Sequence, residues 1–304
     1  MKIIRNAAGI RGIKCSVVTL GNFDGIHAGH QRILKRLVKR AKAQGCPSVV
    51  YTFEPHPLKV VAPHKSPQII LDIADKEAII GSFGVDYLVL ARFTRSFAAT
   101  HPRKFVEEVL VKGLRAKEVW VGAGFSFGKG RSGNVEYLKL LGKELGFKVS
   151  AVPPYKKGSQ TVSSSRVREL IKSGDVKGAA SLLGRSYSMK GKVSRGSARG
   201  VVLGFPTANL RITSELVPAD GVYAAYAFVG KKRYDAVVNI GVAPTFGKRE
   251  RAVEAHILGF NRDIYGKNIA VSFLKRLRDE KAFRGKEGLM RQIKKDIERA
   301  SRYF

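Results

Sequence analysis

The chain has few cysteines, few acidic residues and no long apolar run. Its 304 residues include two cysteines, Cys15 and Cys46, too few for a disulfide framework or a four-ligand zinc site. Both lie beside apolar segments, so we expect buried and reduced side chains. No segment approaches the roughly 20 apolar residues of a membrane-spanning helix, and glycines interrupt the basic segment Met1–Lys14, unlike a signal peptide. These absences predict a cytoplasmic protein without a membrane partner.

Acidic residues are scarce beside basic ones. The chain has 56 Lys and Arg against 24 Asp and Glu, which gives a formal net charge of +32. This surplus favours contact with polyanions such as nucleic acids, anionic membranes or phosphorylated small molecules, and it does not distinguish among them. The basic residues are spread through almost every expected helix, and no DNA- or RNA-binding motif is present. A nucleic-acid-binding protein is therefore kept as an alternative and not as the main hypothesis.

The first 185 residues alternate β-rich runs with helical patterns. We expect strands at Ser16–Leu20, Ser48–Phe53, Tyr87–Ala91, Glu118–Gly122 and Lys148–Val152. Helices are expected near His30–Gln44, Ile73–Gly81, Pro102–Leu110 and Val135–Leu145. This alternation predicts an α/β, Rossmann-like domain with a parallel sheet covered on both faces. In such folds ligands bind beyond the carboxyl ends of the strands.

The pattern changes after Arg185 to short β-type runs separated by Gly, Pro and Asn turns. Examples are Gly221–Phe228, Tyr234–Ile240, Ala255–Phe260 and Ile269–Leu274, followed by a helical pattern over about 286–301. Dense short strands predict an all-β, closed or nearly closed barrel with a terminal helix. At about 150 residues per domain, we expect two domains, 1–185 and 186–304.

A glycine-rich turn follows the first expected strand and leads directly into a helix. It contains Gly21, Asn22, Phe23, Asp24 and Gly25, followed by His27 and His30. Glycines allow the backbone to approach a ligand closely, and a helix start offers free N–H groups to phosphates. The two histidines can face the same phosphates. The alternative is that either is a simple helix cap or a surface residue.

Residues 21–30 resemble the H-x-G-H signature of nucleotidyltransferases, in the form found in bacterial bifunctional riboflavin kinase/FAD synthetases. The segments Phe53–Pro57, Phe127–Gly133 and Ser163–Arg168 resemble further motifs of that family. The resemblance implies catalytic roles for His27, His30 and Arg168. It implies nucleotide contacts for Lys129, Arg131, Ser163, Ser164 and Ser165, and flavin contacts for Phe53 and Pro57. As alternatives, Ser163 is a helix N-cap, and Lys129 and Arg131 are solvated loop charges.

The segment Leu203–Asn209 resembles the riboflavin kinase motif G-x-P-T-A-N. Further segments match in family order: Pro218–Tyr223, Asn239–Phe246, Val253–Leu258, Tyr265–Lys267 and Leu277–Phe283. The resemblance implies nucleotide contacts for Gly204 and Pro206 and flavin contacts for Arg278 and Glu280. The oxygen atoms of Thr207 and Asn209 suit Mg²⁺ held together with nucleotide phosphates.

Glu254 is the expected catalytic base of this second half. A carboxylate on an alternating strand can accept the proton of an attacking hydroxyl, as a kinase requires. The alternative is an ion pair with Arg251 or Lys248. His256 lies two residues further along the same strand face, and we expect it to be structural.

The resemblance implies a bifunctional enzyme with ATP, riboflavin and FMN as substrates and Mg²⁺ as cofactor. It would phosphorylate riboflavin to FMN and then adenylylate FMN to FAD with release of pyrophosphate. The sequence departs from the family pattern at three places: Gly124 replaces an Asp or Asn, Arg195–Val201 lacks the usual His and Arg, and Ser165 replaces a Thr. A kinase with an inactive first domain is thus a second alternative.

Overall fold

The computed structural model describes residues 1–5, 10–195, 203–245, 248–281, 283 and 285–304. These form two compact units: the first comprises residues 1–67 and 71–163, and the second comprises 68–70 and 164–304. Among the described residues, no helix has the length and apolar character needed to cross a bilayer.

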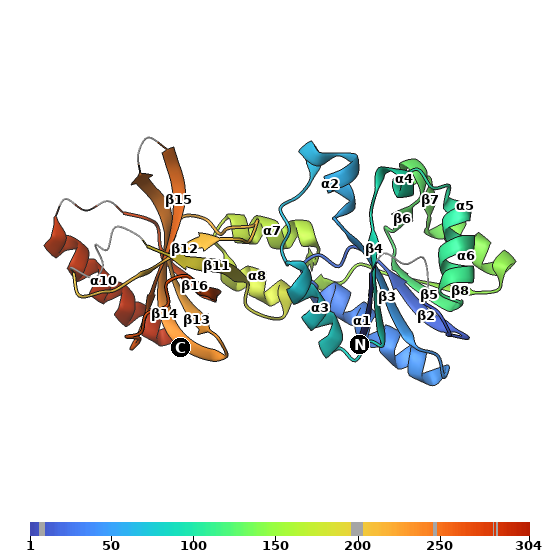
Figure 1. Ribbon diagram of the computed structural model, residues 1–304, viewed down its shortest axis with the longest axis horizontal. Helices are drawn as coiled ribbons and strands as arrows, with labels where there is room; N and C mark the ends of the chain where they lie inside the picture. Colours follow the sequence, from blue (N-terminus) through green and yellow to red (C-terminus); the bar gives the residue numbers. More distant parts are fainter. Residues whose placement is uncertain (6–9, 196–202, 246–247, 282, 284) are drawn as a thin grey trace. The chain divides into compact units, whose positions relative to one another are not determined.

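The first unit is built on a six-stranded sheet (Figure 1). Its strands lie in the order β1 (Lys2–Arg5), β4 (Tyr87–Arg92), β3 (Ser48–Glu54), β2 (Ser16–Leu20), β5 (Ala116–Gly122) and β8 (Lys148–Val152). Every neighbouring pair is parallel, as predicted. The central strand β2 is buried along its whole length, because helices cover both faces of the sheet.

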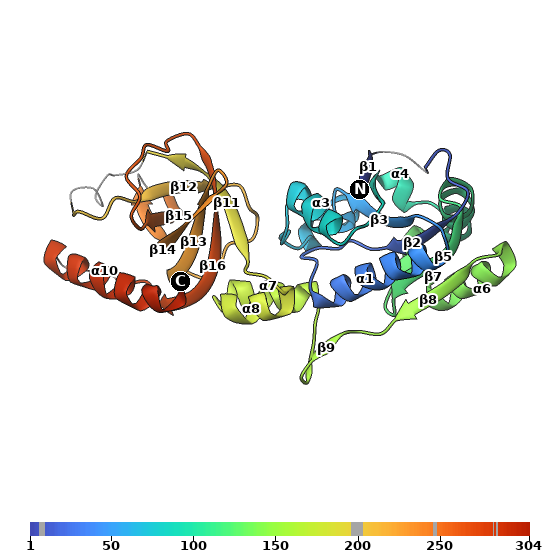
Figure 2. The same ribbon diagram turned by 90° about the horizontal axis from the view of Figure 1, so that it is seen from below.

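Two hydrophobic layers enclose this sheet (Figures 1 and 2). On one face, α1 (Ala28–Ala43) and α3 (Ile73–Ser82) pack Leu34, Leu37 and Ile80 against Val17 and Val50. The other face is covered by α5 (Pro102–Phe105), the wider helical turns of Val106–Gly113 and α6 (Val135–Leu145). Shorter elements complete the unit: α2 (Pro57–Val61), α4 (Arg95–Ala98), and the two-stranded pairs β6 (Ser126–Phe127) with β7 (Gly133–Asn134) and β9 (Lys156–Lys157) with β10 (Gln160–Thr161).

The strand order reverses beside β2. From β2 the chain moves to β3 and β4 on one side, and it later places β5 and β8 on the other side. In a parallel sheet such a reversal leaves a crevice at the carboxyl ends of the strands, where ligands bind. The glycine-rich segment 21–27 begins at that end of β2.

The second unit contains two helices, α7 (Ser164–Lys172) and α8 (Val176–Leu183), and a closed antiparallel barrel. The barrel order is β11 (Ser188–Ser194), β12 (Ala208–Ile212), β15 (Lys248–Ile257), β14 (Lys232–Thr245), β13 (Gly221–Val229) and β16 (Asn268–Arg278). The helix α10 (Lys286–Ala300) contacts β13, β14 and β16. The predicted barrel and terminal helix are thus confirmed, and α8 contacts β16 of the barrel.

Several strand boundaries in the barrel and one expectation about the cysteines are wrong. The strand expected at Ala255–Phe260 spans Lys248–Ile257 instead, and it ends there because the chain turns at Gly259, whose φ is +63°. The strands expected at Tyr234–Ile240 and Ile269–Leu274 extend further, to Thr245 and Arg278. Cys15 and Cys46 are not reduced but form a disulfide, with 5.5 Å between their Cα atoms. The parallel pairing of Val17 with Ser48 brings the two cysteines together at the amino ends of β2 and β3.

Candidate functional site

The segment after β2 is held in an uncommon backbone conformation. Phe23 and Ile26 are non-glycine residues at φ values of +48° and +39°, and Gly25 lies between them at +81°. Both side chains are buried in the core beside α1 and β2. Such strain persists only where surrounding packing fixes it, and it is common at ligand-binding sites. The core therefore fixes the loop in which phosphate contacts are predicted.

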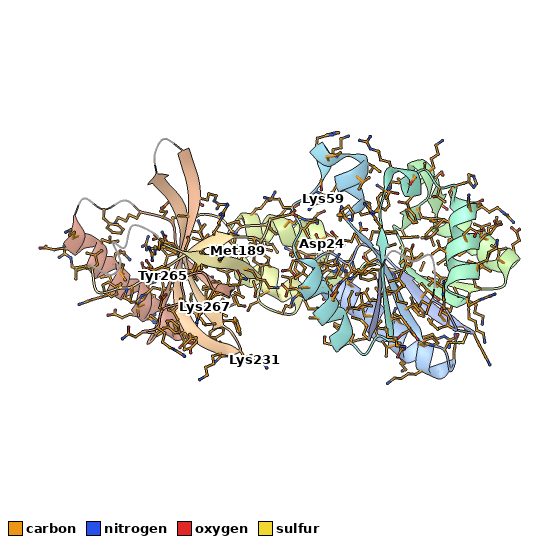
Figure 3. The ribbon with its side chains drawn as sticks, viewed as in Figure 1. Asp24, Lys59, Met189, Lys231, Tyr265 and Lys267 are labelled. Atoms are coloured by element: carbon orange, nitrogen blue, oxygen red, sulfur yellow. A yellow bond between two sulfur atoms is a disulfide. The ribbon has the colours of Figure 1, made fainter. Side chains whose placement is uncertain are left out.

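Polar contacts from β3 and α3 fix the same loop. The carbonyl oxygen of Asn22 accepts hydrogen bonds from Lys76 Nζ at 3.0 Å and from Thr52 Oγ1 at 3.3 Å. The Asn22 side chain contacts His56 Nε2 at 3.3 Å. Asp24, labelled in Figure 3, is buried and accepts from the Leu71 amide at 3.4 Å. Sequence reasoning did not single out Lys76 or Thr52.

The two histidines stack at the start of α1. Their ring centroids lie 3.8 Å apart, and His27 caps the helix by accepting from the His30 amide at 3.4 Å. A side chain on Gly29 would lie 3.2 Å from the His27 ring, so glycine permits this close approach. His27 is buried, which excludes the surface-residue alternative, whereas the capping role is present.

His30 is held neutral by its surroundings. Burial, then the charges of His27 and Lys76, lower its pKa well below the ordinary value of 6.5. The Phe23 ring packs on it at 5.2 Å, and its Nδ1 is buried without a hydrogen-bond partner among the described residues. A neutral imidazole with one unsatisfied nitrogen can still exchange a hydrogen bond with a ligand oxygen.

Gly124, Lys129 and Arg131 are exposed residues of the first unit. Arg131 is exposed at φ +60° and donates from Nε to Ser126 Oγ at 2.7 Å, and Lys129 is also exposed. Their nucleotide contacts therefore stay predictions. Gly124 is exposed, it is not in the left-handed region, and a Cβ there would meet nothing within 4 Å. The structure thus has room for the Asp or Asn that Gly124 replaces.

Phe53 and Pro57 lie at the carboxyl end of β3. Phe53 belongs to an aromatic cluster, with ring centroids 5.4 Å from Phe93 and 5.7 Å from Phe97, and Pro57 is the first residue of α2. Edge-to-face aromatic packing of this kind provides an apolar wall for a planar ring. A flavin contact for either residue stays a prediction.

The serine segment spans the division between the two units. Ser163 ends the first unit, whereas Ser164, Ser165 and Arg168 belong to α7 in the second. Arg168 Nε donates to the Gln68 carbonyl at 2.8 Å. These residues' contacts with a nucleotide stay predictions.

In the barrel, Glu254 lies between two asparagines. It is paired with Asn209 of β12 on one side and Asn239 of β14 on the other, and all three residues are half-exposed. Directly paired side chains on one sheet face are neighbours, so the three polar groups form one cluster. Sequence reasoning assigned no role to Asn239, although this residue begins the N-I-G segment that matches the family.

Arg251, one of the two alternative ion-pair partners of Glu254, is engaged with other groups. It directs its guanidinium to Asp220 and to the Pro218 carbonyl. The side chain of Lys248, the other candidate, lies outside the described residues. His256 fixes the neighbouring loop as a structural residue would, with Nδ1 2.8 Å from the Pro206 carbonyl.

Thr207 and Asn209 fit the predicted Mg²⁺ site by their chemistry. Both are half-exposed, and neither side chain has a hydrogen-bond partner among the described residues. Hydroxyl and amide oxygens are hard ligands that suit Mg²⁺. Gly204 of the same loop has a φ of +79°. Within the described part of the chain, no three His, Cys, Asp or Glu residues gather as an all-protein metal site.

Arg278 and Glu280, the remaining predicted flavin contacts, occupy different environments. Arg278 forms an ion pair with buried Asp296 of α10, with 2.8 Å between Nη2 and Oδ2. Glu280 is exposed, and its carboxylate lies so close to Gly241 that a Cβ there would clash with it. Parts of three motif segments, residues 196–201, 246 and 282, lie outside the described residues.

The comparisons with known proteins agree on both halves of the chain. A family model described as FAD synthetase matches residues 12–166, and one described as riboflavin kinase matches residues 183–304. The bifunctional riboflavin kinase/FMN adenylyltransferases of Escherichia coli K12 and Bacillus subtilis 168 are each 36% identical, over 95% of this chain and 92% of theirs. A solved structure from Streptococcus pneumoniae aligns with this chain over 100% of both chains, with 33% identity and a TM-score of 0.90. It is named as a macrolide-efflux protein, whereas the two family models and the curated relatives agree on flavin enzymes.

Proposed function

The chain belongs to the family of bifunctional riboflavin kinase/FMN adenylyltransferases, and from this premise we propose how its residues divide the two reactions. The barrel phosphorylates riboflavin to FMN, and the parallel-sheet unit joins FMN to AMP to give FAD. The observation that carries this division is that each family model matches a separate part of the chain. The start of the kinase match at residue 183 supports a functional boundary near 185/186.

The kinase step needs a base at the ribityl hydroxyl. Glu254 accepts the proton of the riboflavin 5′-hydroxyl as its oxygen attacks the γ-phosphorus of ATP, and ADP leaves. Its position between Asn209 and Asn239 supports this role, since the amides can orient the carboxylate. Thr207 and Asn209 would hold Mg²⁺, which supplies charge neutralisation for the phosphates when bound. Gly204 and Pro206 shape the loop that approaches the nucleotide.

The adenylyl step needs no strong base. The FMN phosphate is already ionised, so it attacks the α-phosphorus of ATP directly and pyrophosphate leaves. Catalysis then consists of positioning and charge stabilisation. His27 and His30 serve this from the start of α1, where the backbone N–H groups also favour phosphate. Their stacked arrangement on a rigid loop supports the assignment.

The remaining assignments follow the family motifs. We propose phosphate contacts for Lys129, Arg131, Arg168 and Ser163–Ser165, and flavin contacts for Phe53, Pro57, Arg278 and Glu280. Both reactions consume ATP and flavins, which supports the cytoplasm as the place of action.

One incubation tests both activities. The purified chain is mixed with riboflavin, ATP and Mg²⁺, and FMN and FAD are separated and quantified over time. We expect FMN to form first and FAD to follow. If FMN forms but no FAD appears, even when FMN is supplied directly, the result would support a kinase with an inactive first domain. Formation of neither product would refute the proposal.

Matched variants then separate the two sites. Glu254→Gln is expected to abolish FMN formation and to leave FAD synthesis from supplied FMN nearly intact. His27→Ala and His30→Ala are expected to slow FAD synthesis strongly and to spare the kinase. If a folded Glu254→Gln protein lost both activities equally, the two-site assignment would be wrong.

A further inference from the structure

Lys76 is a buried cation that neither proposed reaction uses. It lies in α3 with an exposed fraction of 6%, although lysine is rarely buried without a partner. Burial lowers the pKa of Lys76, and the charges of Asp24 and Glu54 oppose that effect. Keeping this ammonium away from water costs free energy, so the contacts that it makes indicate its use.

Those contacts lead to the loop after β2. Lys76 Nζ donates to the Asn22 carbonyl at 3.0 Å, and Thr52 Oγ1 donates to the same oxygen at 3.3 Å. Asn22 is followed directly by Phe23, the first residue of the loop at positive φ. The two donors thus hold the backbone at the point where it enters its uncommon conformation. Five residues after Asn22 the same loop reaches His27, which caps α1.

We propose that Lys76 is a positioning residue for adenylyl transfer, because its ammonium fixes the Asn22 carbonyl and with it the loop that carries His27 to the phosphates. The inference rests on the proposed FMN adenylyltransferase activity. Lys76 acts through the Asn22 backbone and not by touching the reacting atoms. A methionine of similar length would fill the same volume, but it would leave the Asn22 oxygen with the Thr52 hydroxyl alone.

The test compares Lys76→Met and Lys76→Arg with Lys39→Met. Lys39 is exposed on α1, so its variant makes the same change of charge and side chain without touching the loop. For each protein, kcat and KM of FAD formation from FMN and ATP are measured, together with the rate of FMN formation. Thermal unfolding followed by the fluorescence of Trp120, the single tryptophan, reports the folded fraction.

Loss of loop positioning predicts a change in kcat and not in KM. A misplacement of about 1 Å can cost roughly 100-fold in rate, so we expect Lys76→Met to lower kcat for FAD formation by about 10- to 100-fold. KM for FMN and the rate of FMN formation should stay within about twofold of the wild-type values, because the substitution leaves the contacts that bind FMN untouched. Lys76→Arg restores a cationic donor and should recover most of kcat, and Lys39→Met should match the wild type.

Three results would overturn the inference. One is a folded Lys76→Met protein with wild-type kcat. Another is a loss of kcat that a lower folded fraction accounts for completely and that is equally large in Lys76→Arg. If Lys76→Met does not fold, the neutral Lys76→Gln replaces it, and an unchanged kcat there is the third. A wild-type protein that forms no FAD would instead refute the adenylyltransferase proposal itself, and the inference with it.

Discussion

Replacing Asp296 with asparagine should destabilise the barrel unit by about 3 kcal/mol. Asp296 is buried in α10, and its carboxylate accepts from Arg278 Nε at 3.0 Å, from Arg278 Nη2 at 2.8 Å and from Gln292 Nε2 at 3.0 Å. Removing one charge of a buried pair costs about 3–5 kcal/mol, because the other charge is left uncompensated. We expect the lower end, since the Arg278 side chain is 18% exposed and Arg278 Nη1 keeps its bond to the Asp279 carbonyl.

Hydrogen exchange can locate this loss in the barrel. A loss of about 3 kcal/mol speeds exchange roughly 100-fold for amides that open with the whole unit, and we expect this in β16 and α10. Trp120 lies on β5 of the first unit, so its fluorescence transition in urea should stay unchanged. Asp279→Asn is the matched control, because Asp279 is 84% exposed in its ion pair with Arg276 and such pairs contribute at most about 1 kcal/mol.

Amide hydrogens of β16 and α10 that exchange no faster in Asp296→Asn than in Asp279→Asn would refute this prediction. A double variant, Arg278→Met with Asp296→Leu, provides a further check. Replacing a buried ion pair with apolar side chains of similar volume is often nearly neutral. The double variant should therefore recover most of the stability that Asp296→Asn loses. If it is less stable than Asp296→Asn, the lost stability came from packing and not from the unpaired charge.

Three further predictions concern the first unit and the surface charge. Gly124→Asn should raise the rate of FAD formation without changing FMN formation, because it restores the polar side chain of the family pattern and the site has room for it. An impaired variant would show that glycine itself is needed. Below pH 6.5 the unfolded chain protonates His30 whereas the folded chain resists it, so the first unit should be fully stable above that pH and lose stability as the pH falls. Trp120 fluorescence in urea measures this, and His30→Ala should reduce the slope. The +32 charge predicts weak duplex DNA binding that disappears at moderate salt, measured by fluorescence anisotropy; a sequence preference that persists at physiological salt would revive the nucleic-acid alternative.

Periodicity sufficed for the fold where burial leaves a clear pattern. The central strands β2, β3 and β4 are buried runs of apolar residues, and their expected bounds agree with the structure to within one residue. The edge strand β1 (Lys2–Arg5) was not expected, because half of its residues are basic and three of the four are exposed. It pairs with β4 through its backbone, and backbone pairing at an edge leaves no hydrophobic signal in a sequence.

The site was predictable as motifs but not as contacts. The loop of residues 21–30 follows the carboxyl end of β2, as the expected order of strand, turn and helix indicated. The position of Glu254 between two asparagine-bearing strands was not predicted. The hydrogen bonds that Lys76 and Thr52 make to Asn22 join residues 54 and 30 positions apart. Neither donor belongs to a motif, and a lysine in an expected helix is normally assigned to its solvated face.

Arg278 shows that a motif match does not reveal the partner of a charged side chain. A motif match assigns a residue to a segment, but the partner of its charge depends on what the chain packs nearby. Here the partner is Asp296, 18 residues further along and on a different element. A guanidinium has five N–H donors, so the ion pair with Asp296 and a contact to a flavin are compatible. If Arg278 serves both, an Asp296 variant should change the KM for riboflavin as well as barrel stability, whereas a purely structural Arg278 would change stability alone.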